Sequence, residues 1–192
     1  YSLVAPIPHP RFPGNLVGAF GAVSKAVIIS LEKAGVVKPE ISGKDKRSLG
    51  DGNKRSPACF STSNHWEITV EGKKLAGSAQ RRLSGAFLQH GSILLDWDPE
   101  LAHSLFRYSS ESEQAQGLKS LILGTSTLKE VLSIKPEWRE VAHCFVEGFQ
   151  NTFPGYWQPE TLNSLETELV KEYLEENEQI SFMKGNYKLI DF

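Results

Sequence analysis

The sequence has few of the features that mark a membrane, extracellular or nucleic-acid-binding protein. Its 192 residues contain two cysteines and no apolar run near the roughly 20 residues of a membrane-spanning helix. The net charge is −2, so no basic excess indicates binding to nucleic acid or to an anionic membrane. The first residues, YSLVAPIPHP, lack the basic and apolar segments of a signal peptide. These absences favour a cytoplasmic protein with reduced thiols.

Several common catalytic signatures are also missing from the chain. There is no P-loop, no Gly-x-Ser-x-Gly elbow and no dinucleotide-binding fingerprint. The histidines show no paired metal-ligand spacing, so no metal site is expected. They are His9, His65, His90, His103 and His143.

Strand patterns precede helix patterns along the chain. Apolar and polar residues alternate at 65–72, which predicts a strand, and further strands are predicted at 1–6, 73–82 and 85–96. Apolar residues recur at helical spacing in the predicted helices, which are 15–34, 98–106, 137–152 and 160–177. A polar, basic stretch at 38–57 reads as a long exposed loop. Short turns between the last three strands imply an antiparallel meander, and the chain is expected to be an α+β protein.

Cys59 is a candidate nucleophile. It lies where the basic loop meets the first strand of the meander, with Lys54 and Arg55 nearby in sequence. Positive charge lowers the pKa of a thiol and so raises its thiolate fraction. The alternative is a small, buried structural residue, because free cysteine is among the most buried residue types.

Two adjacent lysines open the next strand. Neighbouring strand residues point to opposite faces, so one of Lys73 and Lys74 must point away from the other. If that face is a cleft, Lys74 is a cation aimed at a substrate, and the small residues 77–79 let the substrate approach the backbone. The alternative is a pair of solvated lysines. His90, which precedes Gly91 on the following strand, is by itself more often structural than catalytic.

The segment GKKLAGSAQRR, followed by LQHGSILLD, resembles the biotin/lipoate protein ligase and lipoyl transferase superfamily. The resemblance implies the α+β fold of class II aminoacyl-tRNA synthetases and biotin synthetases, an antiparallel or mixed sheet packed with helices. It also implies that Lys74 contacts the activated acyl group. The substrate-binding residues it implies are Gly77, Ser78, Ala79, His90 and Gly91.

Two chemistries occur within this superfamily. Lipoate ligases use ATP and magnesium to make an acyl-adenylate, and they usually have an Asn-Asp-type sequence in the region of Cys59. Octanoyltransferases of the LipM type use no cofactor and place a nucleophilic cysteine there. Cys59 precedes Lys74 by fifteen positions, which resembles the transferase arrangement.

The resemblance therefore implies transfer of an octanoyl group through a Cys59 thioester. The implied donor is an octanoyl-acyl carrier protein, and the implied acceptor is a lysine of a lipoyl domain or of a glycine cleavage H protein. No nucleic-acid or membrane partner is expected. The alternatives are an ATP-dependent lipoate ligase fragment and a non-catalytic subunit of a split ligase that binds carrier domains.

The resemblance also suggests how the chain is organised. We expect a catalytic domain at 1–135 and a helical extension at 136–192. The superfamily's Arg-Arg-x-x-Gly-Gly segment, which forms part of the acyl pocket, is absent. The N-terminal part of the fold is thus expected to be missing, either because the chain is a fragment or because a second chain supplies it.

Overall fold

The computed structural model describes residues 1–42 and 66–176. The chain forms two compact units, Tyr1–Pro154 and Gly155–Phe192. The described part of the second unit contains helix α6 (Ser164–Glu176). Among the described residues, the first unit holds the sheet and the remaining helices. Cys59 and most of the predicted basic loop lie outside the described residues.

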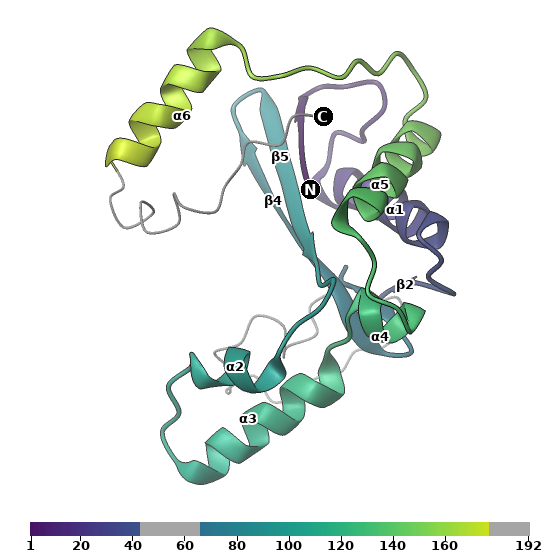
Figure 1. The fold of residues 1–192 in the computed structure, drawn as a ribbon. Coiled ribbons are helices and arrows are strands. Elements are labelled where there is room, and N and C mark those ends of the chain that lie inside the picture. Colours follow the sequence, from purple (N-terminus) through teal and green to yellow (C-terminus); the bar gives the residue numbers. More distant parts are fainter. Residues whose placement is uncertain (43–65, 177–192) are drawn as a thin grey trace. The chain divides into compact units, whose positions relative to one another are not determined.

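The sheet has five strands in the order β1-β5-β4-β3-β2, and every neighbouring pair is antiparallel. Figure 1 shows the long β4–β5 hairpin at its centre. The strands are β1 (Ser2–Pro6), β2 (Glu40–Ile41), β3 (Ile68–Val70), β4 (Lys73–Leu83) and β5 (Ala86–Ile93). The predicted meander of β3, β4 and β5 is confirmed. Strand β2 falls in the predicted loop, because two residues are too few to show an alternating pattern.

The turns of the meander need positive φ angles. Glu71 and Gly72, between β3 and β4, have φ values of 51° and 77°, and Gly85, between β4 and β5, has 84°. Glycine adopts these angles without the steric penalty that a Cβ atom imposes. The glycines at 72 and 85 therefore serve the chain reversals.

The first unit contains five helices within its described residues. They are α1 (Leu16–Lys33), α2 (Pro99–Ser104), α3 (Glu111–Gly124), α4 (Leu128–Leu132) and α5 (Trp138–Thr152). Asn15 caps α1, and Asp98 caps α2 ahead of a proline at its first turn. Thr127 and Glu130 form a capping box at the start of α4. These caps fix where each helix begins.

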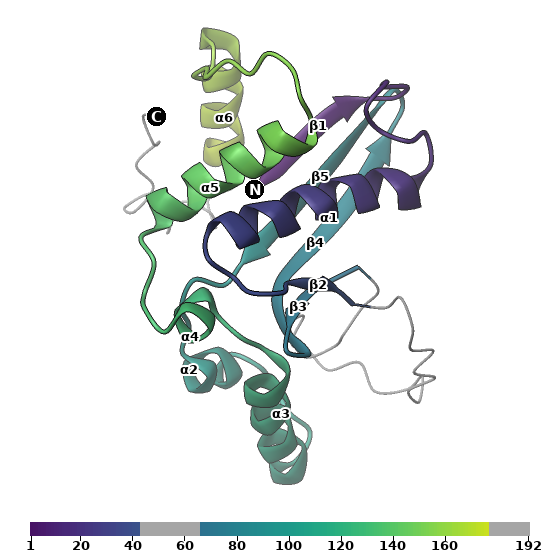
Figure 2. The ribbon, with the colours of Figure 1, turned by 90° about the vertical axis from the view of Figure 1, so that its right-hand side faces the viewer.

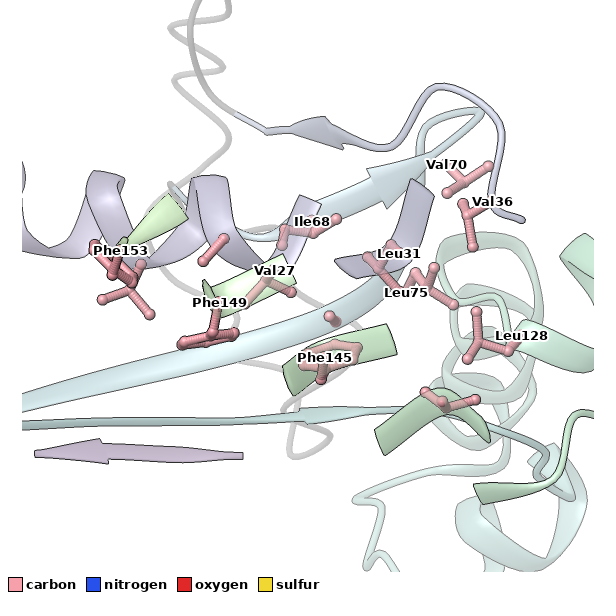
Figure 3. Packing of buried hydrophobic residues seen from close by; sticks show 14 residues of the cluster. Val27, Leu31, Val36, Ile68, Val70, Leu75, Leu128, Phe145, Phe149 and Phe153 are labelled. Carbon is pink, nitrogen blue, oxygen red and sulfur yellow. The ribbon is translucent and has the colours of Figure 1, made fainter. Parts of the chain in front are cut away.

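Helices α1 and α5 lie side by side across one face of the sheet, as Figure 2 shows. Their apolar side chains meet those of the sheet in the main core, where Val27 and Leu31 of α1 face Phe145 and Phe149 of α5 (Figure 3). The helices approach closely at Ser30 and Gly148. A Cβ atom on Gly148 would lie 2.7 Å from Cα of Ser30.

The opposite face of the sheet is much more exposed. Val4 of β1 and Leu83 of β4 are 71% and 65% exposed, and their neighbours Ala5 and Phe87 on the helix-covered face are buried. This alternation defines two faces, here called the helix-covered face and the open face. Exposure along the open face is not uniform, because Glu67, Thr69 and Lys74 at one end of the sheet are buried.

Candidate active site

An irregularity in β4 decides where Lys74 points. Thr69 of β3 pairs with Lys74, whereas the preceding residue, Ile68, pairs with Ala76, so Leu75 is an extra residue in β4. Leu75 and Ala76 are both buried in the main core. Two successive residues pointing to one face are the mark of a β-bulge. Lys74 thus points to the open face, although strict alternation would place it with Ala76 and Ser78.

The position of the Lys74 side chain agrees with this assignment. A Cβ atom on Gly77 would lie 3.1 Å from Cε of Lys74 and 3.4 Å from its Nζ. The lysine side chain therefore extends over Gly77, on the face that Gly77 shares with Ala79. The absence of a side chain at Gly77 provides the space that the lysine occupies.

Lys74 forms a buried ion pair with Glu67, the residue that precedes β3. Nζ of Lys74 donates a hydrogen bond of 2.6 Å to Oε1 of Glu67. The two side chains are only 8% and 6% exposed. Buried charges are costly unless they are paired, so each group stabilises the other in this position.

The backbone of Lys74 is fixed on both sides. It pairs with Thr69 of β3 and forms an isolated parallel bridge with Thr125, which follows α3. The backbone N–H of Ser126 donates a hydrogen bond of 2.9 Å to the carbonyl of Lys74. A residue held by two neighbouring segments keeps the direction of its side chain, which favours a defined site.

Four of the predicted site residues share the open face. Lys74, Gly77 and Ala79 lie along β4, and His90 of β5 is paired directly with Ala79. Ala79 and His90 are exposed. The cation, two small residues and a histidine thus lie along one continuous strip of the sheet.

Ser78 and Gly91 lie on the helix-covered face instead. They pair with each other across β4 and β5, and Oγ of Ser78 shares a hydrogen bond of 2.7 Å with the hydroxyl of Tyr1. The fully buried Gln89 donates to the same hydroxyl over 3.4 Å. Burial raises the pKa of the Tyr1 phenol, while these two hydrogen bonds act in the opposite direction. Ser78 thus contacts Tyr1 and the helix-covered side of the sheet, away from the open face.

Gly91 is required by close packing on that side. A Cβ atom there would lie 2.5 Å from Oγ of Ser78 and 2.7 Å from both the carbonyl oxygen of Gly77 and a ring carbon of Tyr1. The glycine of the predicted His-Gly pair therefore brings β1, β4 and β5 together. The histidine beside it is presented to solvent on the open face.

One edge of β4 also lies open next to the strip. The ladder with β3 ends at Ala76, and no strand among residues 1–42 and 66–176 pairs with that edge from Gly77 to Leu83. Alternate backbone N–H groups along this stretch point away from β5. They are suited to receive a carbonyl oxygen of a bound substrate.

Glu67 was not predicted from the sequence. It is part of the alternating pattern of residues 65–72, in which a glutamate reads as an ordinary exposed strand residue. Its pairing with Lys74 depends on the bulge, and the sequence gives no direct signal of a bulge. The sequence does place an acidic residue, Glu67, and a basic one, Lys74, on two strands joined by a tight turn, and this was the available indication of an ion pair.

The described residues contain no cluster of three or more His, Cys, Asp or Glu side chains that could hold a metal ion. None of the helices among them is long and apolar enough to cross a membrane. Cys59 lies outside the described residues, so its distance from Lys74 stays untested.

Residues 1–150 match the family described as the lipoyl protein ligase A/B catalytic domain. The chain belongs to this family. It is 33% identical over 178 residues to octanoyltransferase LipM of Geobacillus kaustophilus, covering 90% of this chain and 62% of that protein. It is 32% identical over 173 residues to octanoyltransferase LipM of Brevibacillus brevis, covering 90% of this chain and 63% of the relative. The chain thus spans less than two thirds of the length of these relatives.

Solved structures of the lipoyl ligase A/B fold are similar to this chain. A bi-partite lipoate protein ligase from Thermoplasma acidophilum, studied with its E2 lipoyl domain, gives a TM-score of 0.69 at 17% identity. That likeness covers 91% of this chain and 58% of the ligase. Lipoate-protein ligase A bound with ATP gives 0.64 at 18% identity and covers 91% and 60% of the two chains. These likenesses confirm the predicted α+β fold.

Proposed function

We propose that the protein is an octanoyltransferase that transfers octanoyl groups from an acyl carrier protein to a lysine of a lipoyl domain or a glycine cleavage H protein. The observation that carries the proposal is Lys74, held by Glu67 and aimed at the open face beside Gly77 and Ala79. The names of the similar LipM proteins and the presence of Cys59 support transferase over ligase chemistry. No cofactor is required for such a transfer.

The first half-reaction loads the enzyme. The Cys59 thiolate attacks the carbonyl carbon of the octanoyl thioester, the new carbon–sulfur bond forms, and the carrier leaves as a thiol after taking up a proton. The negative charge that develops on the carbonyl oxygen is stabilised by the Lys74 ammonium and by backbone N–H groups at the edge of β4 near Gly77 and Ser78. Lys74 thus stabilises the carbonyl oxygen on which the negative charge develops.

The second half-reaction unloads it. The neutral amine of the acceptor lysine attacks the Cys59 thioester, a carbon–nitrogen bond forms, and the carbon–sulfur bond breaks. The amine proton passes to the departing thiolate, which restores the Cys59 thiol. The octanoyl chain lies along the strip beside Ala79, where each buried methylene adds about 0.8 kcal/mol of binding. His90, which faces Ala79, lies at the side of this chain.

Intact-mass measurement after incubation with octanoyl-carrier protein tests this function. The wild-type protein should gain one octanoyl group, and Cys59→Ser should gain none. Lys74→Met should load at least about a hundredfold more slowly, because it removes the charge opposite the oxyanion. An equal adduct on Cys59→Ser would contradict the cysteine mechanism.

The second candidate is a lipoate ligase, favoured by the likeness to ATP-bound lipoate-protein ligase A. A ligase would form an adenylate from lipoate and ATP, and this activity would survive Cys59→Ser. The third candidate is a carrier-binding subunit of a split ligase, in line with the bi-partite Thermoplasma enzyme. It would bind a lipoyl domain and transfer no acyl group under any condition.

A further inference from the structure

We propose that Glu67 is the positioning residue for the proposed acyl transfer: it holds the Lys74 ammonium in the place where the oxyanion forms. This inference rests on the proposed function of the site. Glu67 has no direct contact with substrate in this role, because it acts through Lys74.

The geometry of the pair supports this role. Lysine has a long side chain with four rotatable methylenes, and an unrestrained ammonium would sample many positions. The 2.6 Å hydrogen bond to Oε1 of Glu67 fixes Nζ at one of them. Among the described residues, Oε2 of Glu67 has no hydrogen-bond partner, so Lys74 is the group to which this carboxylate is directed.

The surroundings of the pair make the arrangement specific. The bulge at Leu75 turns Lys74 onto the face of Glu67, and Gly77 leaves room for the folded-back lysine. Because both side chains are almost fully buried, water competes weakly for the ammonium, and its interaction with a nearby oxyanion is strong.

The burial also explains why a carboxylate is used. A lone ammonium in this position would be costly, and Lys74 would turn towards solvent. The negative charge of Glu67 keeps it inside before substrate arrives. The site is therefore arranged in advance, and no reorganisation is needed when the carbonyl oxygen becomes charged.

Glu67→Gln, which keeps the shape and removes the charge, provides the test in the full-length protein. Single-turnover octanoyl transfer should slow by about a hundredfold, as expected when a catalytic group is misplaced by about 1 Å, with little change in KM. Glu67→Asp keeps the charge on a shorter side chain and should restore part of the rate. The control is Glu71→Gln, an exposed glutamate at the β3–β4 turn, which should transfer at the wild-type rate.

A double-mutant cycle with Lys74→Met separates positioning from an independent role. If Glu67 acts through Lys74, the Glu67→Gln/Lys74→Met protein should be no slower than Lys74→Met alone. If the double variant were slower than Lys74→Met by the full factor that Glu67→Gln causes alone, the two effects would be independent and the inference would be overturned. So would a Glu67→Gln protein within threefold of the wild-type rate.

Stability and activity are kept apart by thermal unfolding of each variant. If Glu67→Gln fails to fold, Glu67→Asp carries the test, and a rate for it equal to wild type would overturn the inference. The double variant, in which neither buried charge remains, provides a second folded comparison. Absence of transfer by the wild-type protein would instead remove the proposed function, and this inference with it.

Discussion

Gly77 and Lys74 are complementary: a Cβ atom on the glycine would lie 3.1 Å from Cε of the lysine and 3.4 Å from its Nζ. The lysine side chain lies along its own strand and reaches over Gly77, three residues further on. The glycine in the Gly-Ser-Ala motif therefore leaves room for the Lys74 side chain, as well as for the proposed substrate.

Gly77→Ala should reduce octanoyl transfer by at least about tenfold while the protein remains folded. The added methyl group pushes the ammonium from its place, and a displacement well below 1 Å has such an effect on a catalytic group. The flexible end of a lysine can move aside, so unfolding should change by less than about 1 kcal/mol. The matched control is Gly14→Ala, where a Cβ atom meets nothing within 4 Å. Full activity of Gly77→Ala would show that Lys74 does not need this position.

Gly148→Ala should destabilise the first unit by about 3 kcal/mol, as overpacking at a tight contact does. Its methyl group would meet the backbone of Ser30, with Cα and N both 2.7 Å away, and rigid backbone cannot yield as a side chain does. Chemical denaturation measures the change. A drop of less than about 0.5 kcal/mol, the range of ordinary surface substitutions, would mean that α1 and α5 do not cross this closely.

Thr127→Ala should cost about 1–2 kcal/mol of stability, because Thr127 is the N-cap of α4. Its hydroxyl accepts from the backbone N–H of Glu130, and the residue is only 1% exposed. Ser110→Ala, which removes the cap of α3 at an exposed position, is the control and should cost less. Thr127→Ser should keep most of the stability. Equal losses in the two alanine variants would argue against a special role for the buried cap.

The link between α1 and α5 through Lys33 and Glu147 should weaken in acid. The hydrogen bond from Lys33, 2.7 Å long, lowers the pKa of Glu147 below its ordinary value of 4.5. A carboxyl whose pKa is lowered on folding stabilises the protein above its unfolded pKa. That stabilisation disappears as the pH falls through the folded value.

Glu147→Gln removes this dependence. The stability difference between wild type and Glu147→Gln should therefore shrink as the pH is lowered from about 6 to about 3, which urea titrations at several pH values can follow. High salt should shrink it at every pH, because the pair is exposed. A difference that grows towards low pH would contradict the assigned direction.

Much of the fold follows from local patterns in the sequence. The meander, the capping box of α4 and the helix 15–34 are set by alternation, turn glycines and cap residues, which act over a few positions. Strand β2 and the partner of β1 depend on pairings between distant segments, which no local pattern encodes. The extent of the first unit to Pro154 depends likewise on packing of α5 against α1.

The candidate site shows the same division. Family motifs identified Lys74, Gly77, Ala79 and His90, which the sheet brings to one face. Glu67 could not be found in this way, because its role arises from one additional residue in β4. Ser78 belongs to the same Gly-Ser-Ala motif as Gly77 and Ala79, yet its side chain faces the helices, since strand residues alternate.

The bulge at Leu75 divides β4 into two stretches, and the alternation of side chains between the two faces is shifted by one residue from one stretch to the other. Regular pairing of the same residues, without the bulge, would turn Lys74 to the face of Ala76, beneath α1 and α5. The local irregularity is thus as important as residue identity in setting the direction of this side chain. Homologous enzymes that keep the lysine should also keep its distance from the glycine unchanged.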